Sequence, residues 1–408
     1  MRLLVYEHVS GGGFCNKPIP ASVLSEGFGM LKTLVSDFKA AGHNVATTLD
    51  LRVAKLNPPI PSGSIAPVSS SKETQAKLLE LSEQADAVYI IAPETDGVLK
   101  SIVELVKQTG AKSLNCSTGA IAKISDKADF YKDTRKIAPQ PESILLSVAE
   151  DLKEIIETIR DRLNFPVVFK PVDGVSCGGI SLVKTENQVA RAIAKIRELT
   201  SDRFLVQQLI EGAAASVSLL STGSKVVPVS LNHQEVKLET VEACSSYSGG
   251  TVPFDHPLRQ KAFEAAEKLV KSSPGLRGYV GVDFVLTDEA AVAIEVNPRL
   301  TTSYVGLRRV VNFNLAQSIV DAVLKRELPT NVESCGCTYF SKVETPNPTI
   351  SALQEMYALE DVVSPPFPVS GNNAASALIA VYGATPEKAK ADFREAKKLV
   401  LNTISRGR

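Results

Sequence analysis

The sequence has no net charge, no long apolar run and few cysteines, and each absence excludes a class of protein. Lysine and arginine total 45, and aspartate and glutamate also total 45, so no bulk positive charge is available to hold a nucleic-acid backbone or an anionic membrane. No segment approaches the roughly 18 uninterrupted apolar residues that a membrane span requires. We therefore expect neither a nucleic acid nor a membrane as a partner.

Targeting and zinc signals are equally sparse. The opening stretch MRLLVYEHV enters a strand pattern at once and lacks the layout of a signal peptide. Six cysteines are scattered along the chain, and only Cys335 and Cys337 lie close together, which is a weak zinc signal without a second pair. A reducing, cytoplasmic location is the simplest expectation.

The order of apolar runs predicts an α/β (α+β) chain of several units, because 408 residues exceed one core of ordinary size. Residues 1–125 alternate short apolar runs with amphipathic stretches, the pattern of parallel strands joined by helices. Residues 126–204 form a unit of the size of a lid, and residues 205–330 a larger, mainly antiparallel sheet. Residues 331–408 are expected to be an appended β/α element that covers this sheet.

Two carboxylates and an amide lie on adjacent apolar strands in GYVGVDFVLTDEAAVAIEVNPR. Glu295 and Asn297 share one face of a strand, and a short turn brings Asp283 of the preceding strand beside them. Oxygens of this kind suit Mg²⁺, with Mn²⁺ as the alternative. Solvated strand ends are the other interpretation, but unpaired charge in apolar strands is costly, which favours a metal. Arg299, just beyond, can clamp a phosphoryl oxygen.

A second pattern favours phosphate binding. In FPVVFKPVDGVSCGGISLV, a strand with Lys170 precedes a glycine-rich loop, where backbone N–H groups can approach an anion closely. The loop is not a Walker motif, because no GK[ST] opens a helix, and an ordinary flexible turn is the alternative. Further on, FLVQQLIEG carries Gln207 and Gln208 in an apolar strand, where amide groups can meet a purine edge.

Taken together and in this order, these motifs resemble the ATP-grasp superfamily over residues 1–325. The resemblance implies an N-terminal pre-ATP-grasp domain, a lid subdomain, a catalytic subdomain, and ATP with Mg²⁺ as cofactors. It implies nucleotide contacts at Lys127, Lys170, Ser176, Gly178, Gly179, Gln207, Gln208, Leu209 and Ile210. It makes Asp283, Glu295 and Asn297 the metal ligands, and Arg299 and Lys170 the catalytic residues.

Two departures from the family pattern concern the nucleotide. Gln207 stands where a glutamate is common, and Ala214 replaces the acid that usually grips the ribose. The metal set is intact, which argues against a catalytically silent nucleotide-binding regulator. A carboxylase-type enzyme and an amino-acid or dipeptide ligase stay open as alternatives, although no AMKM-like biotin carrier turn is present.

A narrower resemblance concerns the substrates. MRLLVYEHVSGGGF and NPRLTTSYVGLR resemble the archaeal tyramine–glutamate ligases of methanofuran biosynthesis. This implies a carboxylate activated as an acyl phosphate and joined to an amine, both small molecules. The glycine triplet lacks the GxGxxG spacing of a dinucleotide site. The expected substrate positions are Glu7, Gly12, Gly13, His233, Gly249, Gly250, Ser303 and Tyr304. His233 has a structural role as its alternative, Tyr304 has core packing, and homo-oligomerisation is left open.

Overall fold

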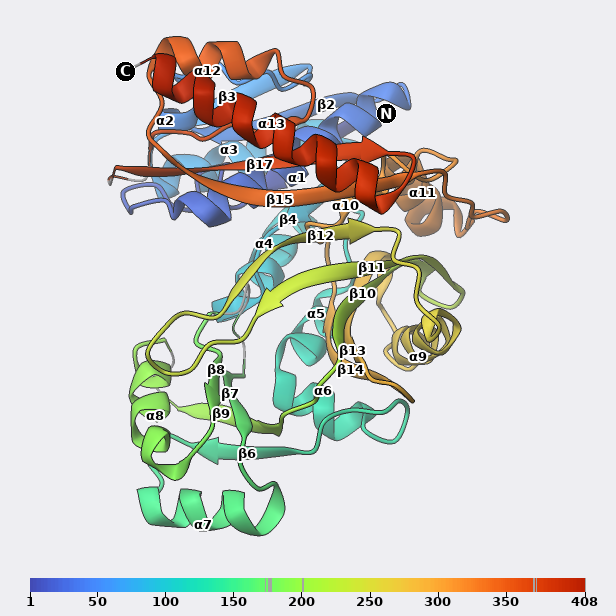
Figure 1. The fold of residues 1–408 in the computed structure, drawn as a ribbon. Helices are drawn as coiled ribbons and strands as arrows, with labels where there is room; N and C mark the ends of the chain where they lie inside the picture. The colour runs from blue at the N-terminus through green and yellow to red at the C-terminus, as the bar shows by residue number, and fades with distance from the viewer. Residues whose placement is uncertain (173, 175–177, 200–201, 370, 372, 408) are drawn as a thin grey trace.

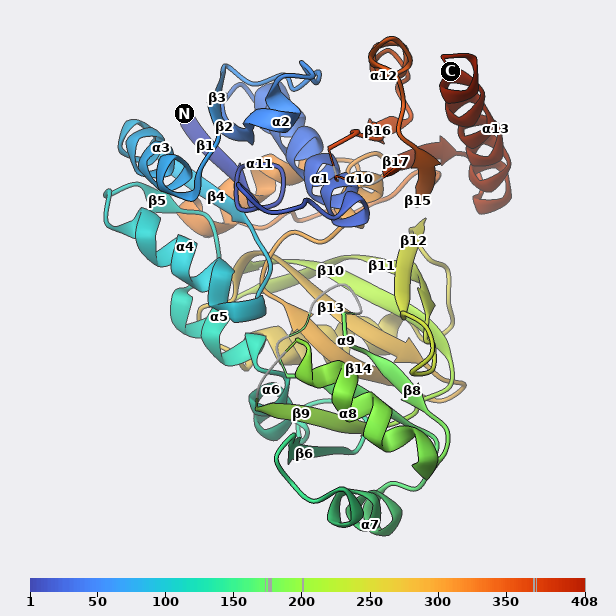
Figure 2. The same ribbon diagram turned by 90° about the vertical axis from the view of Figure 1, so that its left-hand side faces the viewer.

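Three sheets organise the protein in the computed structural model, which describes residues 1–172, 174, 178–199, 202–369, 371 and 373–407. The four-stranded sheet lies at one end of the molecule and the N-terminal sheet with the C-terminal helices at the other, while the eight-stranded sheet runs between them (Figures 1 and 2). In the described ranges, no helix has both the length and the apolar character needed to cross a membrane.

The N-terminal sheet is parallel, with the strand order β3-β2-β1-β4-β5. This confirms the expectation from the alternating pattern, and β4 is buried along its whole length, as a strand covered on both faces should be. The strands are β1 (Arg2–Glu7), β2 (Asn44–Asp50), β3 (Ser64–Val68), β4 (Ala87–Ile91) and β5 (Lys112–Ser113). The helices are α1 (Ala21–Ala40), α2 (Leu51–Ala54), α3 (Ser71–Gln84), α4 (Val98–Lys107) and α5 (Thr118–Ser125), with a short η1 turn (Thr95–Gly97).

The four-stranded sheet is antiparallel, in the order β6-β9-β7-β8. Its strands are β6 (Ser143–Ser147), β7 (Val167–Pro171), β8 (Ser181–Val183) and β9 (Arg203–Gln208), and its helices are α6 (Lys127–Thr134), α7 (Leu152–Arg162) and α8 (Val189–Arg197), with η2 at Glu186–Gln188. Apolar side chains of α7 and α8 pack with this sheet in a separate core. Most of β9 lies beyond residue 204, yet it pairs with β6 and β7, so this strand belongs to the small sheet.

The eight-stranded sheet has the order β14-β13-β10-β11-β12-β15-β17-β16, and its paired neighbours are antiparallel. Its strands are β10 (Ala213–Thr222), β11 (Val226–Lys237), β12 (Ser246–Val252), β13 (Arg277–Leu286), β14 (Ala291–Asn297), β15 (Cys337–Pro346), β16 (Val362–Ser364) and β17 (Ala374–Gly383). The helices of this part are α9 (Arg259–Lys271), α10 (Tyr304–Leu307), α11 (Leu315–Val320), α12 (Ile350–Tyr357) and α13 (Pro386–Arg406), with η3 at Asp321–Lys325.

The C-terminal strands extend this sheet instead of covering it, which corrects the expectation for residues 331–408. β15 pairs with β12 and so continues the hydrogen-bonded ladder into β17 and β16. Without β15, the edge of β12 would present unpaired backbone groups. The helix α13 packs across β15 and β17 (Figure 1).

One hydrophobic core joins the two ends of the chain. Helix α1 packs against β16 and β17 as well as β1, and the rings of Phe28 and Phe367 meet edge to face with centroids 4.7 Å apart. Gly29 of α1 allows a close approach, because a Cβ there would lie 2.7 Å from Cδ2 of Leu378. The C-terminal strands therefore fix the position of α1, which borders the site described next.

Candidate active site

The hairpin of β13 and β14 brings Asp283, Glu295 and Asn297 together. Asp283 lies opposite Glu295 in the strand register, and its Oδ2 accepts a hydrogen bond of 3.1 Å from Nδ2 of Asn297. Its Oδ1 accepts one of 3.1 Å from Nε2 of Gln234 on β11, a residue that was not predicted from the sequence. Two carboxylates and two amide groups thus converge on one face of the eight-stranded sheet.

Two lysines border this carboxylate pair. Nζ of Lys127, in the first turn of α6, lies 3.4 Å from Oε2 of Glu295 and donates to the carbonyl of Gly174 over 2.5 Å. Lys170 on β7 is buried, and burial lowers its pKa to about 7, although Glu295 favours its charged form. The positive charges come from the lid-sized unit and the negative ones from the large sheet.

The electrostatics of the acids indicate that a cation fits between them. Burial, and then the charge of Glu295, raises the pKa of Asp283. Burial also opposes ionisation of Glu295, but Lys127 and Lys170 hold its pKa below the usual value. A divalent cation would relieve this repulsion with the hard oxygens that Mg²⁺ prefers. The described ranges hold no cluster of three or more histidine, cysteine, aspartate and glutamate side chains suited to a metal, so the third ligand here would be the amide oxygen of Asn297.

The expected nucleotide positions lie along the lid-sized unit. Gly178 is exposed, Gly179 has a φ of 74°, and Ser176 lies outside the described residues. The side-chain amide of Gln207 donates to Ser143 Oγ over 2.7 Å, so it is engaged inside the sheet. Of the following residues, Gln208 is exposed, whereas Leu209 and Ile210 are half-buried.

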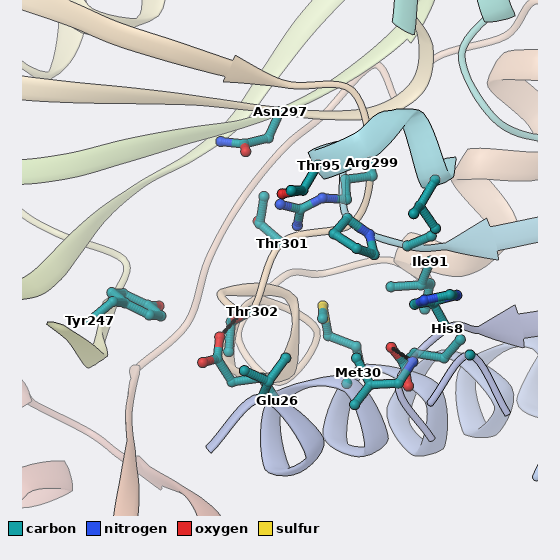
Figure 3. A pocket seen from close by; sticks show the side chains of 18 of the residues that line it. His8, Glu26, Met30, Ile91, Thr95, Tyr247, Asn297, Arg299, Thr301 and Thr302 are labelled. Atoms are coloured by element: carbon teal, nitrogen blue, oxygen red, sulfur yellow. Dashed lines mark hydrogen bonds between the residues drawn. The ribbon is translucent and has the colours of Figure 1, made fainter. Parts of the chain in front are cut away.

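A cavity of about 500 Å³ connects the metal residues to the N-terminal sheet and to α1. Its size is ordinary for a small-molecule site. Figure 3 shows side chains entering it from several elements, with Asn297, Arg299 and Thr301 on one part of the wall and Glu26 and Met30 rising from α1. Of the expected substrate residues, the wall includes Glu7, Gly13 and Ser303.

Arg299 is held in the cavity wall by Glu94. Its Nε donates to Glu94 Oε2 over 3.0 Å and its Nη1 donates to the carbonyl of Leu300 over 3.2 Å. The Oε1 atom of Glu94 is buried without a hydrogen-bond partner among the described residues, so its carboxylate is anchored by the guanidinium. Glu94 was not predicted from the sequence. Its position just after β4 could have indicated a site residue, because ligand sites in parallel sheets form at the carboxyl ends of the strands.

Glu7 organises the loop after β1. Its Oε1 accepts from the N–H of Val9, and its Oε2 accepts from both the N–H and the hydroxyl of Ser10 at 2.6 to 2.9 Å. Gly27 of α1 lies against the carboxylate, since a Cβ there would come within 2.6 Å of it. Three of its acceptor positions are therefore occupied inside the protein.

His8 lies beside Glu7 on the same wall. It crosses directly over Gly13, where any side chain would collide with the imidazole. Burial lowers the pKa of His8 to about 4, so the ring is neutral at ordinary pH.

Three of the expected glycines serve packing away from the cavity. Gly12 has a φ of 111° and faces Val68 and Thr74. Gly249 and Gly250 lie within β12, where a Cβ would collide with the carbonyl groups of the neighbouring strands. None of the three is part of the cavity wall.

The last two expected substrate residues also pack against the protein. His233 on β11 meets the ring of Phe254 edge to face, with centroids 5.1 Å apart. Tyr304 is fully buried, and its hydroxyl donates to Asp37 Oδ2 over 2.6 Å. Tyr304 therefore packs in the core, which was the alternative interpretation, and Asp37 of α1 supplies the buried acceptor for its hydroxyl.

Comparisons with known proteins agree with this arrangement. A family model described as an ATP-grasp domain matches residues 124–303, and one described as a pre-ATP-grasp 3 domain matches residues 43–121. The tyramine–L-glutamate ligase of Methanocaldococcus fervens is 29% identical over 81% of this chain and 97% of its own length. The D-alanine–D-alanine ligase of Carboxydothermus hydrogenoformans is 30% identical over 50% of this chain and 66% of its own length.

Solved structures share the fold. An ATP-grasp superfamily protein from Archaeoglobus fulgidus has a TM-score of 0.62 at 24% identity, with 93% of this chain and 99% of that chain covered. The biotin carboxylase of Campylobacter jejuni in complex with β,γ-ATP has a TM-score of 0.71 at 15% identity, with 97% and 90% covered. The two matched domains and the shared fold confirm the resemblance found in the sequence, and the chain belongs to the ATP-grasp superfamily.

Proposed function

We propose that this protein is an ATP-dependent ligase that joins a small-molecule carboxylate to an amine, with glutamate and tyramine as its substrates. The observation that carries the proposal is the continuity of the cavity. One wall holds Asp283, Glu295, Asn297 and Arg299, and the same space extends to His8 and α1. A site for phosphoryl transfer thus opens directly into room for two small substrates. Its relatives that are named ligases support the same activity.

The side chains divide the work between charge neutralisation and positioning. Asp283, Glu295 and Asn297 would hold Mg²⁺, and Lys127 and Lys170 would neutralise the outer phosphates of ATP. Magnesium-bound ATP would supply the phosphoryl group that turns the carboxylate into an acyl phosphate. Arg299, fixed by Glu94, would stabilise negative charge on the group being transferred.

The amine must reach the activated carbonyl in a space from which water is kept away. The glycine-rich loop after Lys170 is the segment proposed to cover the phosphates, in a domain arrangement of residues 1–125, 126–204, 205–330 and 331–408. Exclusion of water would protect the acyl phosphate from hydrolysis. We place the reaction in the cytoplasm.

An ADP-release assay tests the proposal. With ATP and Mg²⁺, glutamate and tyramine together should release ADP and phosphate and yield an amide detectable by mass spectrometry. A panel of other carboxylates and amines widens the search, and no ADP from any pair would refute the ligase function.

Variants of the metal residues test the site itself. Asp283→Asn and Glu295→Gln should lose turnover by about 10²-fold or more, because each removes a charge that neutralises the metal, while their melting temperatures stay near that of the wild type. Asp50→Asn is the matched control, since Asp50 is buried and paired with Arg52 but does not line the cavity. Full activity in both metal-site variants would show that Asp283 and Glu295 are not the metal ligands.

A further inference from the structure

Helix α1 presents one regular stripe to the cavity. Val23, Glu26, Gly27 and Met30 all line it, and they follow the i, i+3, i+4, i+7 spacing of a single helix face. Val23 and Met30 at the two ends of the stripe are apolar, and Gly27 has no side chain. Glu26 is therefore the only one of the four residues that carries a charge. A single acid on an otherwise uncharged helix face is a candidate for recognition of a polar group of a substrate.

The carboxylate of Glu26 is held from two sides. Its Oε2 accepts a hydrogen bond from the hydroxyl of Thr302 over 2.7 Å. Thr302 follows shortly after β14, the strand that carries Glu295 and Asn297. Its Oε1 accepts from Nζ of Lys342 over 2.5 Å, and Lys342 comes from β15 among the C-terminal strands. Figure 3 shows Glu26 beside Thr302 at the cavity, away from Asn297.

The charge balance of this pair selects what it can bind. The side chains of Glu26 and Lys342 are only 8% and 14% exposed, and such a pair gives little net stability over apolar residues of similar size. Lys342 already neutralises the carboxylate of Glu26, so a cationic group of a substrate would gain little binding energy there. An anionic group would be repelled, because Glu26 and not Lys342 lines the cavity. Each carboxylate oxygen keeps a free lone pair. A neutral hydroxyl donor is therefore the best match.

The surroundings suit an aromatic body. Tyr247 of β12 enters the cavity across from α1 (Figure 3), and Nζ of Lys342 lies 5.6 Å from the centre of its ring. Met30 lies one turn beyond Glu26 on the same stripe, and thioethers make favourable contacts with aromatic rings. Together these groups place an aromatic ring and a thioether in the same cavity as the Glu26 carboxylate.

We propose that Glu26 is a specificity-determining residue that accepts a hydrogen bond from the hydroxyl at the far end of an aromatic amine substrate. Lys342 is a positioning residue that acts through Glu26. The amine nitrogen must lie near the metal residues to form the new bond, which leaves the ring and its hydroxyl for the α1 stripe. This assignment rests on the proposed ligase function and identifies the residues that recognise the amine substrate.

The test compares two amines that differ only by this hydroxyl. Tyramine and 2-phenylethylamine are assayed with glutamate, and the ratio of their kcat/KM values is measured. A site that hydrogen-bonds a hydroxyl rejects the analogue without it strongly, so the wild type should prefer tyramine by about 10²-fold or more. In the double variant Glu26→Met/Lys342→Met, which removes both charges together, the ratio should fall to within about 3-fold.

A matched control comes from the same helix. Asp37 also accepts from a buried hydroxyl and pairs with an arginine, Arg308, but neither lines the cavity. The variant Asp37→Asn/Arg308→Met should keep the wild-type ratio. A melting curve of each variant confirms that the comparison is made on folded protein.

The outcomes separate this inference from the ligase function. If the wild type releases no ADP with any substrate pair, the proposed function fails first. If the wild type is active but its preference for tyramine survives in the Glu26→Met/Lys342→Met variant, the role of Glu26 is refuted. The role is equally refuted if that variant instead loses the preference for glutamate over glutarate, because the acid would then read an ammonium group.

Discussion

At the scale of single residues, the site depends on charges that are held by other buried charges. Arg299 is held by Glu94, Glu295 lies beside Lys127, and Glu26 is paired with Lys342. In each pair the first residue lines the cavity and its partner does not. The positions of these cavity-lining charges thus depend in part on partners that do not line the cavity, and the sequence motifs predict only some of those partners.

The pair of Glu94 and Arg299 gives a direct prediction. Glu94→Gln should lower kcat by about 10- to 10²-fold, because a guanidinium that loses its anchor is no longer fixed where charge develops. The KM for ATP should change by less than about 3-fold, since Lys127 and Lys170 are untouched. Steady-state ADP release measures both quantities, and an unchanged kcat would show that Arg299 needs no support from Glu94.

At the scale of elements, the hairpin of β13 and β14 and helix α1 do most of the positioning. The hairpin places the metal residues, and α1 places the stripe that contains Glu26. Helix α1 is in turn fixed by the C-terminal strands, because Gly29 leaves room for Leu378. The C-terminal part of the chain therefore shapes the substrate end of the cavity without lining it among the described residues.

This packing predicts opposite effects for two helical glycines. Gly29→Ala should lower the melting temperature, because the new Cβ would lie 2.7 Å from Leu378 in a filled core. Gly119→Ala, an exposed position of α5 with nothing within 4 Å, should leave stability unchanged or raise it by up to about 1 kcal/mol. Thermal unfolding of the two variants distinguishes them, and equal melting temperatures would mean that α1 is free to shift away from β17.

At the scale of the whole molecule, the sequence predicted what local patterns encode. Alternating apolar runs predicted the parallel N-terminal sheet, and the strand pattern around Asp283 and Glu295 predicted a hairpin that brings acids together. Contacts between distant segments were not predictable in this way. Nothing near Lys342 in the sequence indicates that it meets Glu26, and the extension of the large sheet by β15 depends on an edge of β12 that only the fold creates.

The same limit explains the substrate residues. Glycines were expected to bind substrate because they permit close approach, but Gly249 and Gly250 use that property to pack against neighbouring strands. Tyr304 is next to residues of the wall in the sequence, yet its side chain points to Asp37 in the core. A residue next to a wall residue in the sequence has its backbone near the cavity, but tertiary packing decides whether its side chain points into the cavity or into the core.

The central claim is that a carboxylate is activated by phosphorylation in this cavity, and an oxygen-isotope transfer tests it most directly. Glutamate labelled with ¹⁸O in its carboxylates is incubated with the protein, ATP, Mg²⁺ and tyramine, and the released phosphate is analysed by mass spectrometry. One ¹⁸O atom should appear in each phosphate, because the carboxylate oxygen that takes the phosphoryl group leaves with it when the amine attacks. Amide formation with unlabelled phosphate, or with the label in AMP, would contradict the account.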